Sequence, residues 1–539
     1  MPKIAKQTLF LLIVAFALLG ASLAIFPALV PRLFANKPSN LVSNTSPSLL
    51  AADTDLAARV SRVENGLLPA VLIKDAPRKP MTILERMAFY NVPGVSVALF
   101  DHGQIVWTRA YGFADITSKK PVTPDTLFQA GSISKPVSAL GALRLVQDGK
   151  LSLDEDINIK LRTWKVPETG FPDMGRVTVR RILSHSAGLT VSSFLGYSSG
   201  ENIPSVVQIL NGETPANNPP IRVEVAPGTQ WRYSGGGFVV LQTLMSDVTG
   251  RRFTEIMREL VLDPAGMTHS TFDQPFTKKR AVETTTPYHA NGDPIKGGPH
   301  IYPEMAAAGL WTTPSDLARM AMEVQEEYMG KSSKILRQSM AQQMLSDQIG
   351  NWGLGFALQE PGHPAHFFHG GGTAGYACYL DGYTDTGQGF AIMTNSDGAG
   401  RLIEEVFRSV ATEYGWPDHR PVEILGLSLG GVAFVAVPCL IVLTYEKWTQ
   451  GSRQQVPPWR SVVGLACMVG TFLSWLGLAV LTLSILMHPS TSLFSPEWIP
   501  RIALLTFTGT FFGFALRGAS RMGAILTGLL MVTAWLTSA

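Results

Sequence analysis

The distribution of apolar residues limits what this 539-residue chain can fold into more than any other feature. Only 16% of the residues are charged and the mean hydropathy is +0.16, which is too apolar for a wholly soluble protein of this length. A helix of about 20 apolar residues crosses a bilayer. Apolar runs on this scale lie at 8–30, 424–444, 461–487, 502–516 and 522–538. The sequence therefore predicts membrane segments at both ends and a folded domain between them.

The N-terminal run, within residues 1–30, follows Lys3 and Lys6 and has small residues around Ala21 and Ala24. These features suit a secretory signal peptide, although the run is longer than a typical apolar region of one. The run is also long enough to be an uncleaved signal anchor. Both alternatives stay open, and in both cases the segment directs the following residues across the membrane.

The four C-terminal runs, within residues 421–539, predict four transmembrane helices, and the basic residues between the helices predict their orientation. The loop 488–500 contains no Lys or Arg, whereas the two flanking loops contain Lys447, Arg453 and Arg460, and Arg517 and Arg521. The basic loops therefore face the cytoplasm. This places residues 31–421 on the outer, periplasmic or extracellular, side of a bacterial inner membrane. No ionisable residue lies in the middle of a run, so we expect an anchor rather than a transport path.

The remaining composition excludes some partners. A net charge of +3 without a long Lys/Arg run argues against nucleic acid. The three cysteines, Cys378, Cys439 and Cys467, lack the paired spacing of a disulfide framework or a zinc site. No metal or other cofactor is expected, and no protein partner can be assigned. Residues 31–80 are expected to form a tether and lead-in, rich in Ser, Asn and Pro at the start.

Residues 81–420 alternate between strand-like and helix-like patterns. The β-rich runs 95–100 and 104–112 are joined by a turn sequence typical of a hairpin. Residues 150–310 are mostly loop and helix, with helical periodicity at 177–189 and 238–262. Strand patterns return at 353–360, 366–371, 375–383 and 389–396, before a helix at 401–415. This order predicts an α+β fold in which one antiparallel sheet, flanked by helices, is assembled from both ends of the domain around an inserted all-helical region.

Ser132 and Lys135 lie in FQAGSISKPV, residues 128–137, where a turn leads into a helix expected to end at Gly149. A serine at this point suits a helix N-cap without any chemistry. At i+3, the Lys135 ammonium also lies on the same helix face as Ser132, where it can assist removal of the hydroxyl proton. Pro136 fits the first helical turn, whose N–H groups have no helical partner. This stretch alone leaves capping and catalysis open.

Two more motifs follow in order: WRYSGGG, which contains Tyr233, and FHGGG, which contains His369, Gly370 and Gly371. With Ser132-x-x-Lys135, they resemble the S-x-x-K, Y-x-N and K-T-G or H-x-G motifs of the serine β-lactamase and penicillin-binding-protein family. The resemblance is to the branch of class C β-lactamases, esterases and D-aminopeptidases. It covers roughly residues 85–415 and extends to ILSHSAGL (182–189), PGTQWRYSGGG (227–237), LDPAGM (262–267) and AAGLWTTPSDLARM (307–320).

The resemblance implies a role for each motif residue. Ser132 would attack a carbonyl group and form an acyl-enzyme. Lys135 and Tyr233 would share the base role, with the phenol taking the serine proton and later activating water. A phenol needs a nearby cation to do this at neutral pH. His369 would lie on the edge strand and orient this network or a substrate carboxylate.

The backbone N–H groups of Ser132 and Gly372 would form the oxyanion hole, and Gly371 and Ser234 would bind substrate beside it. The sequence departs from the family at Gly235, where an asparagine usually hydrogen-bonds the acylamino group of a β-lactam or peptide. Glycine has no side chain to make that bond. We therefore expect a roomier pocket or donors from other loops, and true β-lactamase activity stays an alternative.

Further histidines compete with this interpretation. His363, His366 and His369 recur at three-residue spacing, but residues i and i+3 of a strand point to opposite faces. A metal site is therefore not expected, and His363 and His366 are assigned to a loop. His185 resembles a structural family residue near a helix end rather than a general base.

Together these features predict a membrane-anchored, extracytoplasmic serine hydrolase that cleaves an amide or ester bond. Its substrate would be a D-residue-containing peptide or an acylated small molecule. The alternative is a penicillin-binding sensor that is acylated and stalls. The tyrosine at position 233 favours turnover, and no output domain is recognisable. Substrate identity depends on loops within 160–300, whose residues carry no transferable code.

Overall fold

The computed structural model describes residues 49–69, 71–73, 79–167, 170–171, 175–276, 282–359, 366–416 and 422–424. The chain divides into two units, residues 1–59 and 60–539. The boundary falls within helix α2 (Leu49–Asn65), and all other described elements belong to the second unit.

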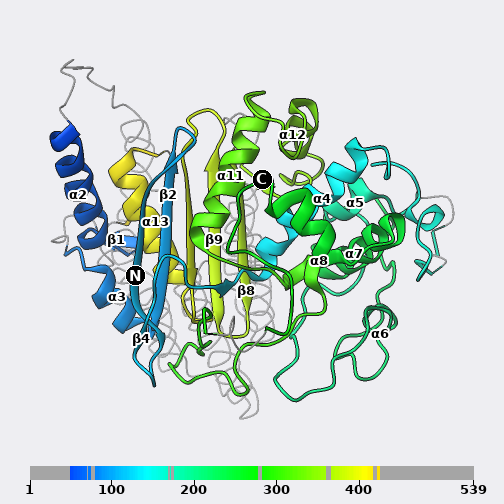
Figure 1. The fold of residues 1–539 in the computed structure, drawn as a ribbon, viewed down its shortest axis with the longest axis horizontal. Helices are drawn as coiled ribbons and strands as arrows, with labels where there is room; N and C mark the ends of the chain where they lie inside the picture. Colours follow the sequence, from blue (N-terminus) through cyan, green and yellow to red (C-terminus); the bar gives the residue numbers. More distant parts are fainter. Residues whose placement is uncertain are drawn as a thin grey trace, which may run out of the picture. The chain divides into compact units, whose positions relative to one another are not determined.

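The second unit contains a seven-stranded antiparallel sheet in the order β4-β3-β2-β10-β9-β8-β7 (Figure 1). Its first strands in sequence are β2 (Gly94–Asp101), β3 (Gln104–Asp115) and β4 (Lys120–Pro121). Its last strands are β7 (Ala357–Leu358), β8 (His366–Thr373), β9 (Tyr376–Tyr383) and β10 (Gly389–Thr394). The prediction of one sheet built from both ends of the domain is confirmed, although the strand expected at 353–360 shortens to β7.

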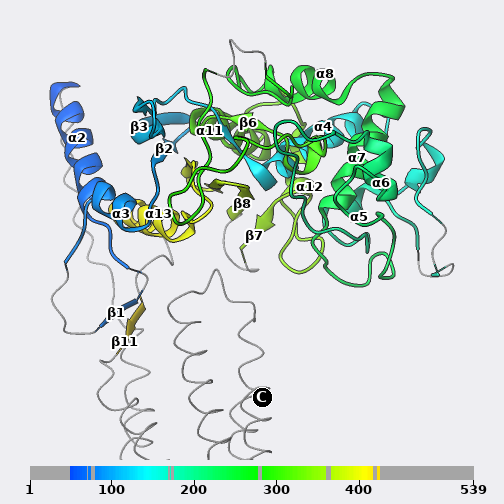
Figure 2. The same cartoon turned by 90° about the horizontal axis from the view of Figure 1, so that it is seen from below.

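Helices cover both faces of this sheet (Figure 2). One face packs against α11 (Pro314–Tyr328), and the other against α13 (Gly400–Tyr414), which in turn contacts α3 (Ile83–Phe89). A buried ion pair between Arg86 and Glu405 joins α3 to α13. These layers hold β8 and β9 in a fixed position beside the helical region.

The helical region lies between the two sets of strands in the sequence. It contains α4 (Ser134–Gln147), α5 (Val179–Leu183), α6 (Val206–Asn211), α7 (Gly235–Thr249), α8 (Phe253–Met257), a π-helical segment (Arg258–Leu262) and α10 (Met305–Ala308). The region also contains two short 3₁₀ turns (Gly131–Ile133 and Ile157–Ile159), the paired strands β5 (Phe128–Gln129) and β6 (Trp311–Thr312), and helix α12 (Gln338–Met344). The inserted helical region is therefore as expected in outline.

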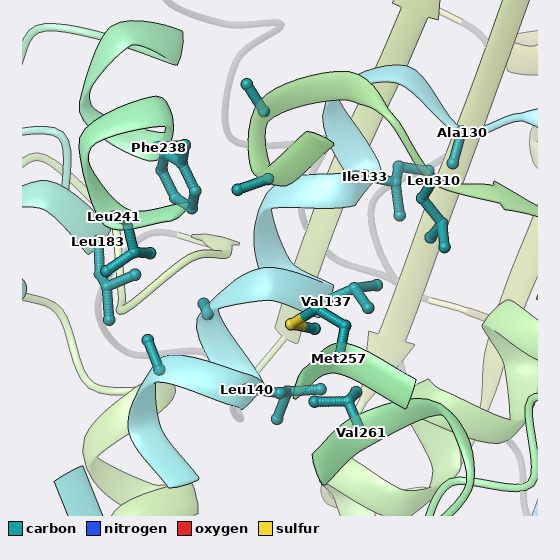
Figure 3. Close-up of a cluster of buried hydrophobic side chains, with 14 of the residues drawn as sticks. Ala130, Ile133, Val137, Leu140, Leu183, Phe238, Leu241, Met257, Val261 and Leu310 are labelled. Atoms are coloured by element: carbon teal, nitrogen blue, oxygen red, sulfur yellow. The ribbon is translucent and has the colours of Figure 1, made fainter. Parts of the chain in front are cut away.

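Helix α4 lies in the middle of the core, with Val137 and Leu140 packed among side chains of α8, the π-helical segment and neighbouring elements (Figure 3). Burial of this helix on nearly all sides holds the residues at its N-terminus in place. The helix ends as predicted, because Gly149 has a φ of +73°. The region with predicted helical periodicity, 238–262, is helical but is interrupted at Gly250, whose φ is +68°.

The expected membrane segments at 1–30 and 421–539 lie outside the described residues, apart from β11 (Val422–Ile424), which pairs in parallel with β1 (Val71–Ile73). No helix in the described part of the chain has both the length and the apolar character needed to cross a bilayer. The expected tether at 31–80 includes α2, so part of it is helical.

Candidate active site

Ser132 lies in the 3₁₀ turn that leads into α4, and its side chain is partly exposed. Its hydroxyl makes no capping hydrogen bond to either helical segment. Lys135 Nζ donates to Ser132 Oγ at 3.0 Å instead. The capping interpretation is therefore wrong, and the serine and lysine lie together as their spacing predicted.

Lys135 is almost completely buried, with 2% of its surface exposed. Its Nζ donates to the carbonyl oxygen of Ala307 in α10 at 3.0 Å and lies 4.9 Å from the ring centroid of Tyr233. No carboxylate forms an ion pair with this ammonium among the described residues. A buried cation without a negative partner strongly favours any negative charge that develops nearby.

Tyr233 lies just before α7 and shares a cavity with Ser132. The ring of Tyr233 packs against His185 at 4.3 Å and lies 6.0 Å from Trp352, measured between centroids. Its hydroxyl makes no hydrogen bond within the described part of the chain, so it is available to a substrate or to a proton in transit. The cavity has a volume of about 330 Å³ and is lined by Ser132, Tyr233, Trp352, Ala357, Phe368, His369, Gly370, Gly371 and Gly372.

His369 reaches this cavity from β8, which is the edge strand at this point because β7 pairs only with Phe367 and Phe368. Its Nδ1 lies 2.6 Å from the carbonyl oxygen of Gly370, which can only accept, so Nδ1 carries the proton and donates. Burial, with the added effect of Lys135, lowers the pKa of His369 to about 3. The imidazole is therefore neutral at neutral pH, and its buried Nε2 is an acceptor that has no partner among the described residues.

The predicted oxyanion hole depends on a close approach of two backbone segments. Gly131 has a φ of +50°, and a Cβ atom on it would lie 2.6 Å from the backbone nitrogen of Gly372. Ser132, the next residue, lines the same cavity as Gly372, as the predicted oxyanion hole requires. Gly371 has a different reason to be glycine, because its Cβ would lie 2.0 Å from the carbonyl oxygen of Ala130. This glycine allows protein backbone, rather than substrate, to approach the strand.

The structure corrects the expectation for Ser234. Its hydroxyl donates to the carbonyl of Thr190 at 3.0 Å and accepts from the N–H of Gly237 at 2.9 Å, and the residue is buried. The side chain therefore caps α7 and does not line the cavity.

The expected extra room beside Gly235 is also absent. A Cβ atom there would lie 2.9 Å from the carbonyl oxygen of Ser192 and 3.2 Å from the ring of Phe194. These residues occupy the space beside Gly235 into which a side chain would extend.

Two other histidines are structural. His185 accepts the N–H of Ser234 through Nδ1 at 3.1 Å and packs against Tyr233, and burial lowers its pKa well below the ordinary value. The loop assignment of His366 is wrong, because it lies buried in β8 with its Nε2 2.7 Å from Asp381. His363 lies outside the described residues, and no group of three His, Cys, Asp or Glu side chains in the described ranges is arranged to hold a metal ion.

Sequence reasoning missed the apolar lining of the cavity and the carbonyl that holds the lysine. Trp352 and Ala357 belong to no recognised motif, and Phe368 begins the FHGGG motif but was given no role there. Ala307 lies in the recognised AAGLW stretch, but its backbone oxygen acts here, and side-chain patterns do not predict such a role.

Comparison with known proteins assigns this arrangement to a family. The model of the family described as Beta-lactamase matches residues 82–411, more than half of the chain, and the chain therefore belongs to the β-lactamase family. Proteins with a similar sequence or fold include an esterase, a hydrolase with acyltransferase activity and a β-lactamase/D-alanine carboxypeptidase.

Individual relatives are distant. Protein flp of Staphylococcus aureus is 23% identical over 243 residues, covering 44% of this chain and 45% of the relative. The chain thus spans about half the length of these curated relatives. Esterase EstB of Burkholderia gladioli is 27% identical over 327 residues, covering 52% of this chain and 80% of the esterase.

Solved structures share the fold. An octameric penicillin-binding protein homologue from Pyrococcus abyssi has a TM-score of 0.52 at 24% identity, covering 63% of this chain and 77% of the homologue. EstCE1, described as a hydrolase with promiscuous acyltransferase activity, has a TM-score of 0.52 at 20% identity, covering 67% of this chain and 99% of EstCE1.

Proposed function

We propose that this protein cleaves an ester or amide bond through an acyl-enzyme formed on Ser132. The hydrogen bond from the buried Lys135 ammonium to a partly exposed Ser132 hydroxyl, 3.0 Å long, carries this proposal. Tyr233 and Gly372 border the same cavity as Ser132. The group thus supplies a nucleophile, a proton acceptor and an oxyanion donor in one place.

The steps follow from these positions. Ser132 Oγ attacks the carbonyl carbon while its proton passes to the Tyr233 phenolate, which the Lys135 ammonium stabilises. Negative charge on the carbonyl oxygen is received by the N–H groups of Ser132 and Gly372. When the C–O or C–N bond breaks, the departing alcohol or amine takes the proton from Tyr233. Water then gives a proton to the phenolate and attacks the acyl carbon, and Ser132 regains its proton on release.

The proposed location is the outer side of a bacterial inner membrane, with residues 421–539 as a helical anchor. The apolar runs and the basic loops between them support it. After alkaline carbonate extraction, the full-length protein is expected in the membrane pellet, and protease added to spheroplasts is expected to digest residues 81–420. Recovery of the intact protein in the soluble fraction would contradict the anchor.

The nucleophile is tested by labelling the full-length protein in detergent with a fluorescent fluorophosphonate. Wild type is expected to be labelled and Ser132→Ala to remain unlabelled, with both proteins unfolding at similar temperatures. Unlabelled, folded wild type would contradict the proposal. A penicillin label that persists for hours, without hydrolysis of any ester or amide, would favour the stalled sensor instead.

A further inference from the structure

The cavity beside Ser132 has no charged side chain in its lining, although Lys135 is close to Ser132. None of its nine lining residues is Lys, Arg, Asp or Glu. Lys135 is not among these lining residues, and its Nζ donates to the oxygens of Ser132 and Ala307. Among the described residues, this cavity therefore offers no free cationic side chain to a substrate carboxylate.

His369 occupies the position where many relatives have the lysine of the third motif, but it does not replace that charge. It is neutral, and its protonated Nδ1 is used by the carbonyl of Gly370. The remaining ring nitrogen, Nε2, has a lone pair and no proton. A lone pair repels a carboxylate and suits only a hydrogen-bond donor.

The wall of the cavity is apolar and aromatic. Trp352, Phe368 and Ala357 are among its lining residues. The indole of Trp231 lies 5.5 Å from that of Trp352 and is 41% exposed, which extends the aromatic surface toward solvent. Apolar and aromatic walls with a few directed polar groups are typical of pockets that bind uncharged groups.

We propose that this site selects neutral esters or amides that carry an aromatic or other apolar group against Trp352, and discriminates against substrates with a free carboxylate next to the scissile bond. The inference rests on the proposed acyl-enzyme function and adds the substrate class. A carboxylate entering this cavity would lose its hydration without gaining a cationic partner, whereas an uncharged group would not incur that cost.

A matched pair of depsipeptides tests the charge. Phenylacetyl-glycyl-D-lactate and its lactamide have the same scissile ester and nearly the same size, and differ by one negative charge. Wild-type kcat/KM is expected to be at least 10-fold higher for the lactamide. His369→Lys, which introduces a cation, is expected to shift the ratio at least 10-fold toward the carboxylate.

The aromatic wall is tested with a separate variant. The proposal then does not depend on whether His369→Lys, which places a lysine at a buried position, folds normally. Trp352→Ala is expected to lower kcat/KM for the phenylacetyl lactamide at least 10-fold more than for its acetyl analogue. Trp164→Ala is the matched control, because Trp164 hydrogen-bonds Asn211 in the helical region and does not line the cavity. It is expected to leave the phenylacetyl-to-acetyl ratio unchanged.

Equal or faster hydrolysis of the carboxylate by wild type would overturn the inference and leave the hydrolase function standing. Hydrolysis of neither depsipeptide would also overturn it. Fluorophosphonate labelling of Ser132 in the same preparation then tests the hydrolase function itself. A folded protein that is not labelled would contradict both the hydrolase function and the proposed substrate class.

Discussion

Two histidines three residues apart on β8 have opposite surroundings. His366 faces Asp381, with an Nε2–Oδ2 distance of 2.7 Å, and stacks on Tyr383 at 4.4 Å between ring centroids. His369, on the other face, borders the cavity and has no carboxylate partner among the described residues. Both are buried, with 5% and 4% of their surfaces exposed. Residue type and burial are thus the same, and the neighbours differ.

The difference indicates that, within one strand, His366 has a structural role and His369 has a functional one. A histidine held by a carboxylate and a stacked ring adds to stability, although Nδ1 of His366 has no hydrogen-bond partner among the described residues. A neutral histidine with an unpartnered nitrogen beside a cavity is costly to the fold, and such a cost is typical of functional sites. Substitutions on the cavity face should therefore change activity, and those on the opposite face should change stability.

Gly131→Ala is expected to have the largest effect on the cavity side. The new Cβ would lie 2.6 Å from the nitrogen of Gly372 at a φ of +50°, so the two oxyanion donors must separate. A loss of about 10³ in kcat is expected, comparable to losing one oxyanion-hole donor. Gly149→Ala is the matched control, because its φ is +73° and its Cβ would meet nothing within 4 Å. Equal kcat values for the two variants would contradict the oxyanion assignment.

Tyr233→Phe removes the phenol while keeping the ring that packs on His185. A decrease in kcat of at least about 10² is expected if the phenol accepts the serine proton. Tyr379→Phe is the counterpart on the other face, because it removes a hydroxyl that donates to Asp381. That variant is expected to lower the unfolding temperature and to keep kcat within a factor of about three. Near-normal turnover by Tyr233→Phe would remove this tyrosine from the mechanism.

Much of this arrangement could be predicted from the sequence, because the patterns that indicate it involve residues close together in the chain. The hairpin turn, the order of strand-like and helical patterns and the S-x-x-K spacing each depend on residues close together in the chain. They located the sheet, the inserted helical region and the pairing of Ser132 with Lys135. The family resemblance added Tyr233 and His369, which no local pattern connects to the serine.

The errors arose where distant segments decide a residue's role. The spacing of His366 and His369 is the same whether Asp381 lies opposite one of them or not. Ser234 is polar and follows the motif tyrosine, but the carbonyl of Thr190 and the start of α7 use its hydroxyl. Gly235 suggested an open space, which the backbone of Ser192 fills. Such contacts are made only after the chain has folded, and a single sequence does not display them.

A paired substitution tests the two faces of β8 directly. His366→Ala leaves the buried Asp381 with the Tyr379 hydroxyl as its remaining partner among the described residues, so the free energy of unfolding is expected to fall by about 3 kcal/mol, in line with broken buried pairs. Its kcat/KM is expected to stay within a factor of about three. His369→Ala is expected to reverse the pattern, with kcat/KM reduced about 10-fold and a smaller change in stability. Urea unfolding and ester hydrolysis on both variants measure this, and equal losses of activity would contradict the division.

The smallest expected effect concerns Glu304, a buried carboxyl that lacks the partner Asp381 has. Both its side-chain oxygens have no hydrogen-bond partner among the described residues, and burial raises its pKa from 4.5 to about 7. The folded state therefore holds this proton more tightly than the unfolded state. The stability that results is complete below about pH 4.5 and is lost as the pH rises through about 7.

Glu304→Gln keeps the shape of the side chain and removes this titration. Between pH 5 and pH 8, the free energy of unfolding of wild type is expected to fall by roughly 2–3 kcal/mol more than that of the variant. Glu327, whose pKa burial also raises to about 7, remains in both proteins and cancels in the difference. Urea unfolding at several pH values gives the two curves. Parallel curves would mean that the Glu304 carboxyl is hydrogen-bonded in solution. Glu304 would then not differ from Asp381 in lacking a partner.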